Sequence, residues 1–344
     1  MHNDTYLNWV INHTPTTWWH DSADLEELQR GLERGAIGVT TNPFLTNVAV
    51  AKYRAQWASE IGEILAKNPA AEVKAEALMR MTVTKVAERL MPRYETSGGR
   101  SGFVCAQVNP ARAGDREPML AMARRFHQWA PNIAVKLPAT AAGLDVLEDS
   151  IAEGLTITAT VSFNVPQAIA IAERHRRGIA RARRQGVEPG RCFAVIMIGR
   201  LDDYLREVAH DTGAAVSESD IRQAGLAVTK RAYGLYKDRG YEAVLLVAAL
   251  RGPYHLTELA GAELIMSIAP PYQVMFVDHD HPREARISNP VPSDVIDRLR
   301  QMPEFVKGYE PDGMSPNEFI SYGATKRTLA QFSELGWKLL EGCK

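Results

Sequence analysis

Cysteine is scarce in this chain: its 344 residues include three, Cys105, Cys192 and Cys343. Their odd number argues against a framework of disulfide bonds, and no CxxC pair provides the spacing of a zinc site. We therefore expect two thiols in the core and one near the C-terminus, with no structural metal.

An excess of one charge is also missing, because 40 basic residues stand against 41 acidic ones. A net charge of -1 provides no overall field for nucleic acid or for an anionic membrane, so any anion site has to be local. No apolar run reaches membrane-spanning length, and the segment MHNDTYLNWVINHT lacks the basic and apolar regions of a signal peptide. We expect a cytoplasmic protein that binds neither nucleic acid nor membrane.

What the chain does have is a regular alternation of short β-prone runs and longer helical segments. Eight runs are rich in β-branched and apolar residues: 16–21, 37–41, 102–108, 133–138, 156–163, 192–199, 243–250 and 264–268. Helix-like segments separate them, as in repeated β/α units. The pattern predicts an α/β fold, a closed (β/α)₈ TIM barrel with extra helices.

Domain organisation follows from this alternation. We expect one domain over 1–344, with a barrel core at about 16–270 and a helical extension over 271–344. In the extension, short helical pieces between prolines lead to a final amphipathic helix at about 325–340. The mostly helical region 48–90 is expected to end at Pro92, and a second such region is expected over 201–239.

One lysine stands inside an apolar strand. Lys136 lies in the run IAVKLPAT, residues 133–140, which is typical of a buried parallel strand. Two interpretations remain open from the residues alone. The ammonium can extend past the strand end or pair with a carboxylate. Alternatively, desolvation lowers its pKa and leaves a neutral amine that attacks a carbonyl to form a Schiff base.

Polar residues collect at the ends of the predicted strands, where barrel enzymes carry their chemistry. In chain order they are Asp21, Thr41, Asn42, Gln107, Asn109, Lys136, Thr158, Thr160, Arg200 and Arg251. Structural alternatives exist for some of them. Asp21 can cap the following helix, although Ser22 and Asp24 can also do so, and the two arginines can be salt-bridged scaffold residues.

Several motifs in this chain resemble those of the transaldolase family, in the family's order. They are GVTTNPFL at 38–45, VKLPAT at 135–140, the run 153–167, GRLDDYL at 199–205, the segment 18–21 and LRGPYHLTELAGAELIMSIAP at 250–270. The resemblance covers roughly residues 16–340, and the agreement of several motifs in order and spacing makes it specific.

The resemblance implies a class I Schiff-base enzyme that moves a dihydroxyacetone unit between sugar phosphates, a reaction of the pentose phosphate pathway. Lys136 matches the family's Schiff-base lysine, and Asp21 matches its general acid and base. Asn42 matches the asparagine that binds the dihydroxyacetone unit, and Thr160 matches the threonine that positions the catalytic water. Schiff-base chemistry of this kind implies no cofactor and no metal.

Further substrate contacts are expected from the same motifs. Arg200 and Arg251 match the family's phosphate clamp, which suits a planar guanidinium. Thr41 and Thr158, close to the matched positions, are additional substrate-binding candidates. Family members often form dimers, so a homodimer is a candidate assembly, although no segment of the sequence identifies an interface.

Departures from the family pattern leave the reaction open. Gln107 stands where most transaldolases have a glutamate that activates water, and the related fructose-6-phosphate aldolases also have glutamine there. An aldolase that releases free dihydroxyacetone is therefore the first alternative. Val195, Met197 and Ala249 predict a less polar substrate pocket than the family's. A barrel that binds sugar phosphates without turning them over is the second alternative.

Overall fold

Eight parallel strands form a closed barrel in this computed structural model, which describes residues 5–344 apart from the side chain of Asp278. Each strand pairs with its sequence neighbours, and β8 pairs with β1 to close the sheet. The strands are β1 (Thr17–Asp21), β2 (Val39–Thr40), β3 (Val104–Gln107), β4 (Ile133–Pro138), β5 (Ile157–Thr160), β6 (Cys192–Met197), β7 (Val244–Ala248) and β8 (Ile265–Ile268). The predicted (β/α)₈ fold is confirmed, and each strand lies within its predicted run.

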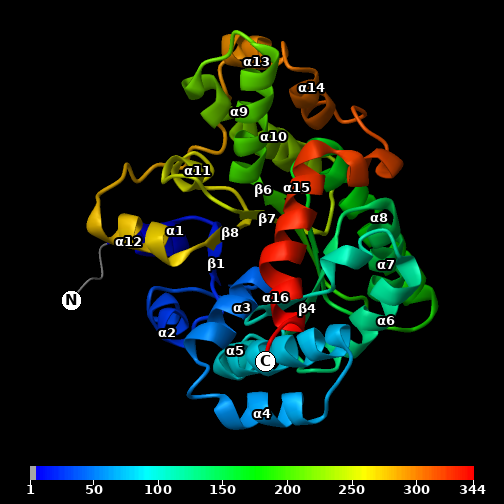
Figure 1. Ribbon diagram of the computed structural model, residues 1–344. Coiled ribbons are helices and arrows are strands. Elements are labelled where there is room, and N and C mark those ends of the chain that lie inside the picture. Colours follow the sequence, from blue (N-terminus) through cyan, green and yellow to red (C-terminus); the bar gives the residue numbers. More distant parts are fainter. Residues whose placement is uncertain (1–4) are drawn as a thin grey trace.

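Helices surround this barrel, as Figure 1 shows. They are α1 (Tyr6–His13), α2 (Leu25–Glu33), α3 (Pro43–Lys52), α4 (Ala58–Ala66), α5 (Ala71–Thr96), α6 (Arg116–His127), α7 (Ala141–Ala152), α8 (Val165–Arg184), α9 (Ile198–Thr212), α10 (Glu218–Asp238), α11 (Tyr254–Thr257) and α12 (Pro270–Asp278), with a 3₁₀ turn η1 (Pro110–Arg112). After the barrel come α13 (Ser293–Leu299), α14 (Pro303–Tyr309), the 3₁₀ turn η2 (Pro316–Ser321), α15 (Gly323–Phe332), a π-helical turn η3 (Ser333–Trp337) and α16 (Lys338–Glu341).

The regions 48–90 and 201–239 are mostly helical as expected, but each contains more than one helix, and the end of the first differs from the expectation. Region 48–90 contains parts of three helices, and the third, α5, continues through Pro92 to Thr96. The expected stop at Pro92 was wrong because this proline is exposed near the end of a helix held by buried residues such as Leu78, Val86 and Leu90. Packing of that face outweighs the loss of one backbone hydrogen bond. Region 201–239 divides at Gly213, whose φ of 66° ends α9.

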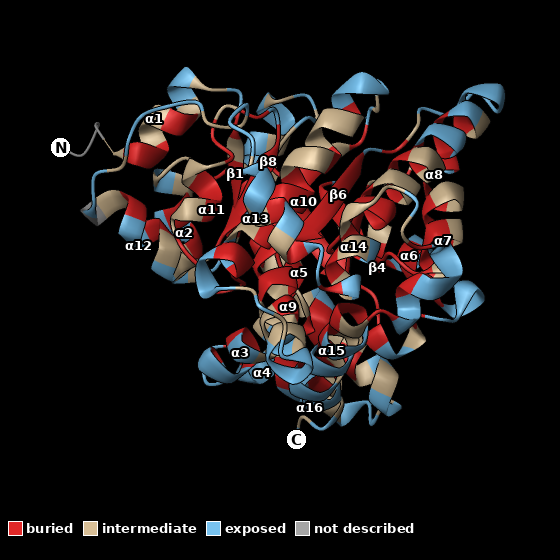
Figure 2. Ribbon diagram, turned by 90° about the horizontal axis from the view of Figure 1, so that it is seen from above, coloured by how far each residue is buried: buried red, intermediate tan, exposed pale blue. Residues whose placement is uncertain are grey.

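The centre of the barrel is filled by aromatic side chains, and burial is concentrated on the strands (Figure 2). Trp19 and Phe193 are in edge contact with ring centroids 4.7 Å apart, and Phe103 lies 5.5 Å from Phe193 on its other side. Aromatic burial of this kind makes a packed interior rather than a pore. Polar side chains that could act on a substrate are therefore expected at the rim of the barrel.

Strand register brings polar residues together at the C-terminal rim. Lys136 on β4 pairs with Gln107 on β3 and with Thr158 on β5, and Pro138 pairs with Thr160. At the ends of β1 and β2, Asp21 pairs with Thr40. Because parallel strands end at one face, residues far apart in sequence share the same mouth.

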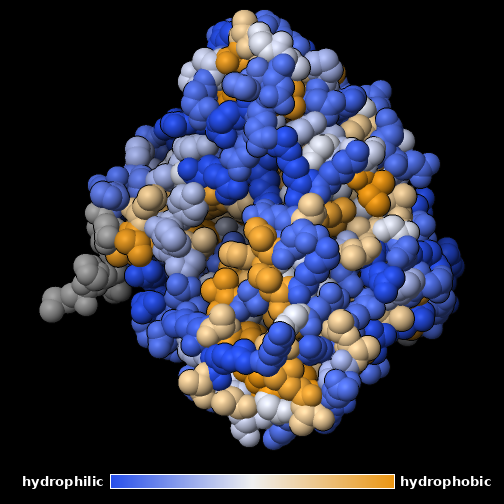
Figure 3. All heavy atoms as spheres, viewed as in Figure 1, coloured by the Kyte–Doolittle hydropathy of each residue, from blue (hydrophilic) through white to orange (hydrophobic). Residues whose placement is uncertain are grey.

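The last helices lie across that mouth, as the red segment in Figure 1 shows. Gly336 in η3 packs against the start of α3, where a Cβ would lie 2.6 Å from the Phe44 backbone nitrogen. Only a residue without a side chain permits this approach. Seen as spheres, this face carries apolar residues in its central and lower part and hydrophilic residues above them (Figure 3).

No helix within residues 5–344 has both the length and the apolar character needed to span a membrane.

Candidate active site

A cavity of about 70 Å³ opens at the C-terminal end of the strands. Its walls are Asp21, Thr40, Asn42, Lys136, Thr160, Val195, Met197, Arg200, Leu246, Ala248, Ala249 and Phe332. Five candidate site residues from the sequence are among them, together with Val195, Met197 and Ala249, which were also named for the pocket, and Phe332 comes from helix α15. The structure therefore brings much of the predicted set into one small space.

Lys136 occupies the centre of the site in a state suited to nucleophilic chemistry. The residue is 5% exposed, and its Nζ donates a hydrogen bond of 3.0 Å to the Thr41 carbonyl oxygen. Within the described residues it forms no ion pair with a carboxylate, so neither structural interpretation of this lysine applies. Burial lowers its pKa from the usual range, with Arg200 adding to the effect and Cys105 and Asp21 opposing it. Burial therefore shifts the equilibrium of Lys136 toward the neutral amine.

Asp21 lies at the end of β1 and faces the same cavity. It does not cap α2, because Asp24 does so by accepting hydrogen bonds from the backbone N–H groups of Glu26 and Glu27. Burial raises the pKa of Asp21, while the Thr40 hydroxyl and Lys136 pull it down. A carboxyl group with a raised pKa, next to an amine with a lowered one, is the arrangement of an acid and base pair.

Thr40 was not predicted as a site residue, and it holds the Asp21 carboxylate. Its Oγ1 donates to Asp21 Oδ1 over 2.6 Å and lies 2.5 Å from Ser267 Oγ. Since the single hydroxyl proton of Thr40 goes to the carboxylate, Ser267 has to donate to Thr40. The two hydrogen bonds, from Ser267 on β8 to Thr40 on β2 and from Thr40 to Asp21 on β1, fix the position of the Asp21 carboxylate.

Replacing Thr40 by valine is expected to remove that donor and raise the pKa of Asp21 further. A charge-assisted hydrogen bond of about 1.5–3 kcal/mol corresponds to about 1–2 pH units. For Asp21 as the candidate base, which accepts a proton only when ionised, the acid limb of kcat/KM is expected to move to higher pH by that amount. A pH profile measures it, with Thr40→Ser as the control that keeps the hydroxyl. Identical profiles for Thr40→Val and the parent would contradict the role of these hydrogen bonds.

The remaining strand-end residues divide into two groups. Thr160 and Asn42 line the cavity. Thr160 is fully buried, and its hydroxyl oxygen lies 3.9 Å from Met197 Sδ. Asn42 caps α3, because its Oδ1 accepts a hydrogen bond from the backbone N–H of Leu45. Thr41, Gln107 and Thr158 do not line the cavity. Thr41 contributes its backbone carbonyl, while Thr158 contacts Cys105 Sγ at 3.4 Å.

Gln107 is 2% exposed, on the strand beside Lys136. Its Oε1 has no hydrogen-bond partner in the described part of the chain. A buried acceptor without a partner costs free energy unless a ligand or water supplies the donor. This orphaned oxygen is a reason to keep Gln107 in the candidate site.

Arg200 is a partly buried cation with neutral partners. Its Nη1 bonds Gln331 Oε1 at 2.5 Å and Thr328 Oγ1 at 3.5 Å, and its guanidinium lies 5.1 Å from the Phe332 ring centre. Burial lowers its pKa to about 10, and Arg251 adds to that shift. Among the described residues it has no ion-pair partner and its Nε is unpartnered, so an anionic ligand would stabilise it.

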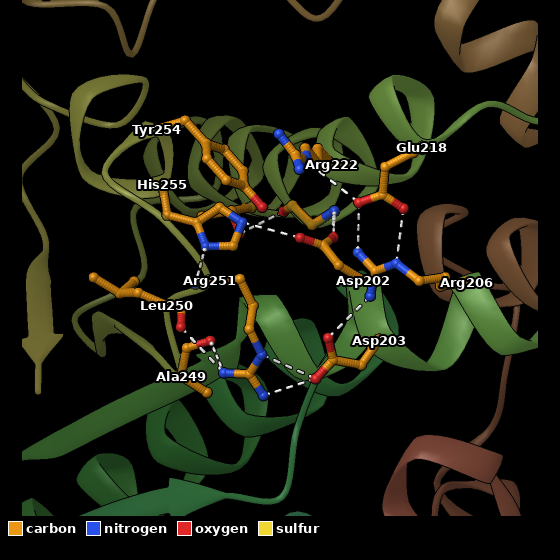
Figure 4. Close-up of polar contacts among 12 residues, drawn as sticks. Asp202, Asp203, Arg206, Glu218, Arg222, Ala249, Leu250, Arg251, Tyr254 and His255 are labelled. Atoms are coloured by element: carbon orange, nitrogen blue, oxygen red, sulfur yellow. Dashed lines mark hydrogen bonds and ion pairs between the residues drawn. The ribbon is translucent and has the colours of Figure 1, made fainter. Parts of the chain in front are cut away.

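Arg251 lies beside the cavity rather than in its wall. Its Nε and Nη2 donate to Asp203 Oδ2 over 2.9 and 2.7 Å (Figure 4). Its Nη1 donates to the carbonyl oxygens of Ala249 and Leu250. The scaffold salt bridge considered from sequence is thus present for Arg251, and it is absent for Arg200 in the described residues.

Apart from Thr40, the residues missed from sequence reach the site from distant parts of the chain. Ser267 on β8 supports Asp21 through Thr40, and Gln331 and Phe332 come from α15. Thr40 and Ser267 lie inside the motifs at 38–45 and 250–270, but no local pattern predicts their contact, because it depends on barrel closure. The contribution of Gln331 and Phe332 depends on the path of α15.

No cluster of three or more histidine, cysteine, aspartate or glutamate side chains suited to holding a metal ion occurs among the residues that the structure describes. The Arg200 guanidinium in the wall of the cavity would also repel a metal ion. The donors and acceptors present suit an oxygen-rich organic ligand.

The fold and the site together define a (β/α)₈-barrel enzyme with a buried lysine and a carboxylate at the C-terminal mouth of the barrel. The family described as Transaldolase/Fructose-6-phosphate aldolase matches residues 18–313. The chain therefore belongs to this family, as the motifs indicated.

Individual relatives are similar at a moderate level. A probable transaldolase of Dehalococcoides mccartyi is 28% identical over 264 residues, which is 76% of this chain and 89% of the relative. The transaldolase of Neisseria gonorrhoeae is 26% identical, over 74% of this chain and 77% of its own length. That of Thiobacillus denitrificans is 28% identical, over 68% of each chain.

Proposed function

We propose that this enzyme transfers a dihydroxyacetone unit between sugar phosphates through a Schiff base on Lys136. The observation that carries the proposal is the buried Lys136 amine, whose pKa is lowered by desolvation and whose Nζ contacts a backbone carbonyl instead of a carboxylate. The neutral amine attacks the C2 carbonyl of a ketose phosphate, and the carbinolamine takes up a proton from solvent and loses water to give an iminium ion; the later hydrolysis of the iminium returns that proton.

Asp21 performs the proton transfers. Its carboxylate accepts the C4 hydroxyl proton as the C3–C4 bond breaks, and the bond's electron pair moves to the iminium, which becomes an enamine. The aldehyde product leaves. When an acceptor aldehyde enters, the enamine carbon attacks it, and Asp21 returns the proton to the new hydroxyl oxygen. Water then hydrolyses the iminium and frees Lys136.

Side chains around the nucleophile orient the bound unit. Asn42 uses Oδ1 to cap α3, so its Nδ2 amide group is the part that remains to donate to a substrate hydroxyl. Thr160 and the free Oε1 of Gln107 bind the hydrolytic water. Thr41 and Thr158 support the nucleophile: the first through its carbonyl, the second from the neighbouring strand.

Arg200 binds the phosphate group. Within the described residues it is a partly buried guanidinium with no carboxylate partner, and a phosphate would supply the missing charge and acceptors. Arg251, held by Asp203, adds positive potential next to it. Gln331 occupies one donor of Arg200 and would be displaced by the phosphate or bind beside it.

An aldolase that releases dihydroxyacetone is the second candidate, because Gln107 resembles the glutamine that fructose-6-phosphate aldolases have at this position. A glutamine holds water but cannot take its proton, so in such an aldolase another group accepts the proton when the iminium is hydrolysed. The acceptor requirement separates the two functions. With fructose 6-phosphate as donor, a transferase should turn over at least about 10-fold faster with erythrose 4-phosphate than without it. Equal turnover without the acceptor would make the aldolase the correct assignment.

Gln107→Glu provides the matched variant for that comparison. A carboxylate at this position accepts a proton from the attacking water, so the acceptor-independent rate should change while the rate of transfer changes less. Release of dihydroxyacetone and formation of the new ketose phosphate are measured in the same reaction. If the substitution affects both rates equally, Gln107 does not act on the water.

Location in the cytoplasm, assembly as a homodimer and a single domain over 1–344 remain predictions. Size-exclusion chromatography with light scattering measures the assembly directly.

A further inference from the structure

The loop after β7 has a strained backbone and a buried support. Ala249 adopts a φ of 60°, in the left-handed region that favours glycine. Opposite it, Gly199 leaves the space that the loop occupies, because a Cβ there would lie 2.3 Å from the Ala249 carbonyl oxygen and 2.4 Å from Arg251 Cγ. A strained loop persists only when its surroundings hold it, so the groups that hold this one are of interest.

His255 and Asp202 form a pair of fully buried side chains, and Figure 4 shows them beside Arg251. His255 Nε2 lies 3.0 Å from Asp202 Oδ2, and His255 Nδ1 accepts a hydrogen bond of 3.1 Å from the Arg251 backbone N–H. The other oxygen, Asp202 Oδ1, accepts from Gly225 N over 2.8 Å. Because Nδ1 is an acceptor, the ring proton sits on Nε2 and is donated to the carboxylate.

The pair connects three elements to a single residue of the loop. His255 belongs to α11, Asp202 to α9 and Gly225 to α10. Through His255, the pair holds the backbone N–H of Arg251. The guanidinium of Arg251 is held separately by Asp203, the next residue of α9. Two successive aspartates of one helix thus fix the main chain and the side chain of the same arginine.

We propose that His255 and Asp202 are positioning residues that hold Arg251 for binding the phosphate of the substrate. This inference rests on the proposed function, since it takes Arg251 as part of the anion site. A pair that merely filled the core would have no reason to end on the backbone of a residue in a strained loop beside the cavity. The strict order of donors and acceptors, Arg251 N to Nδ1 and Nε2 to Asp202, also leaves no freedom in the orientation of the ring.

The order of donors and acceptors around His255 predicts the effect of replacing Asp202 by asparagine. In Asp202→Asn one carboxylate oxygen becomes an NH₂ group, which would face either Gly225 N–H or His255 Nε2–H. Reversing the tautomer of the ring would turn Nδ1–H toward the Arg251 N–H. Every arrangement loses one hydrogen bond, so this isosteric substitution releases the loop.

The main test replaces both partners by leucine, His255→Leu with Asp202→Leu, because removing both polar groups together avoids a buried unpaired charge. We expect KM for erythrose 4-phosphate to rise about 10-fold or more, with kcat changed less than about 3-fold. KM for erythrose, which has no phosphate, should stay the same. If KM rises equally for both acceptors, or for neither, the positioning role is overturned.

Controls separate this inference from stability and from the proposed function. His175→Leu removes another buried histidine, which contacts the Gly190 carbonyl away from the site, and should leave both KM values unchanged. His255→Gln offers one acceptor and one donor in the same order and should restore most of the affinity for erythrose 4-phosphate. If the double variant does not fold, Asp202→Asn gives the same comparison, with an expected rise of about 3-fold or more.

Borohydride trapping of dihydroxyacetone on Lys136 is measured in all of these variants. Retained mass gain with a raised KM for the phosphorylated acceptor supports the positioning role. Absence of a mass gain in the parent enzyme would instead overturn the Schiff-base proposal, so the two failures are distinguishable.

Discussion

Lys136→Met is expected to abolish Schiff-base formation and at the same time to stabilise the fold. Without the amine no iminium forms, so kcat/KM should fall by about 10⁴-fold or more. Methionine fills nearly the same volume without a polar nitrogen to desolvate, and a gain of roughly 1–2 kcal/mol in the free energy of unfolding is expected. Mass spectrometry after borohydride reduction measures the first effect, and urea denaturation the second.

The stability gain should depend on pH in a defined direction. The pKa of Lys136 is lower in the folded protein than in the unfolded chain, so the unfolded chain binds more protons between the two values. The parent enzyme therefore loses stability as pH falls from the unfolded value of about 10.4 toward the folded one. Methionine does not bind a proton, so the free energy of unfolding of Lys136→Met should exceed that of the parent enzyme by more at pH 7 than at pH 10.

Lys136→Arg is the matched control, because arginine stays charged and cannot form an imine. It should be inactive and less stable than the parent enzyme. A Lys136→Met protein that still gains mass with a ketose and borohydride would show that another amine is the nucleophile.

Asp21→Asn is expected to separate carbon–carbon bond cleavage from imine formation. Asparagine can keep the hydrogen bond from Thr40 through its carbonyl oxygen but cannot accept the C4 hydroxyl proton. Loss of a general base lowers kcat by about 10²–10⁴-fold. Imine formation with dihydroxyacetone requires no cleavage, so borohydride trapping should persist, and single-turnover kinetics with fructose 6-phosphate would locate the slow step.

Asp24→Asn is the control three residues away. Asp24 caps α2 and contacts Lys52 and Tyr53 outside the cavity. Asparagine also caps helices, so this substitution should lower stability only through the lost ion pair with Lys52, by about 1 kcal/mol or less, and leave the rate nearly unchanged. Equal losses of rate in Asp21→Asn and Asp24→Asn, or loss of trapping in Asp21→Asn, would contradict the assignment of Asp21 as the base.

The eight strands could be predicted from sequence because each is a short buried run between helical segments, a pattern that local composition determines. Helix ends were harder. Pro92 predicted a stop that packing of α5 overrides, and the division of the helical region 201–239 at Gly213 was not predicted. Short-range preferences amount to a few kcal/mol, so burial of a long helix face can outweigh them.

The sequence alone determined the family, the barrel and the presence of Lys136 in a buried strand, because these depend on residue type, order and local periodicity. Tertiary structure decided which polar groups touch. Closure of the barrel places Ser267 and Thr40 next to Asp21, α15 brings Gln331 and Phe332 to Arg200, and His255 contacts Asp202, which is 53 positions away in the sequence. These contacts join distant segments, so their chemistry depends on distances that no local pattern encodes.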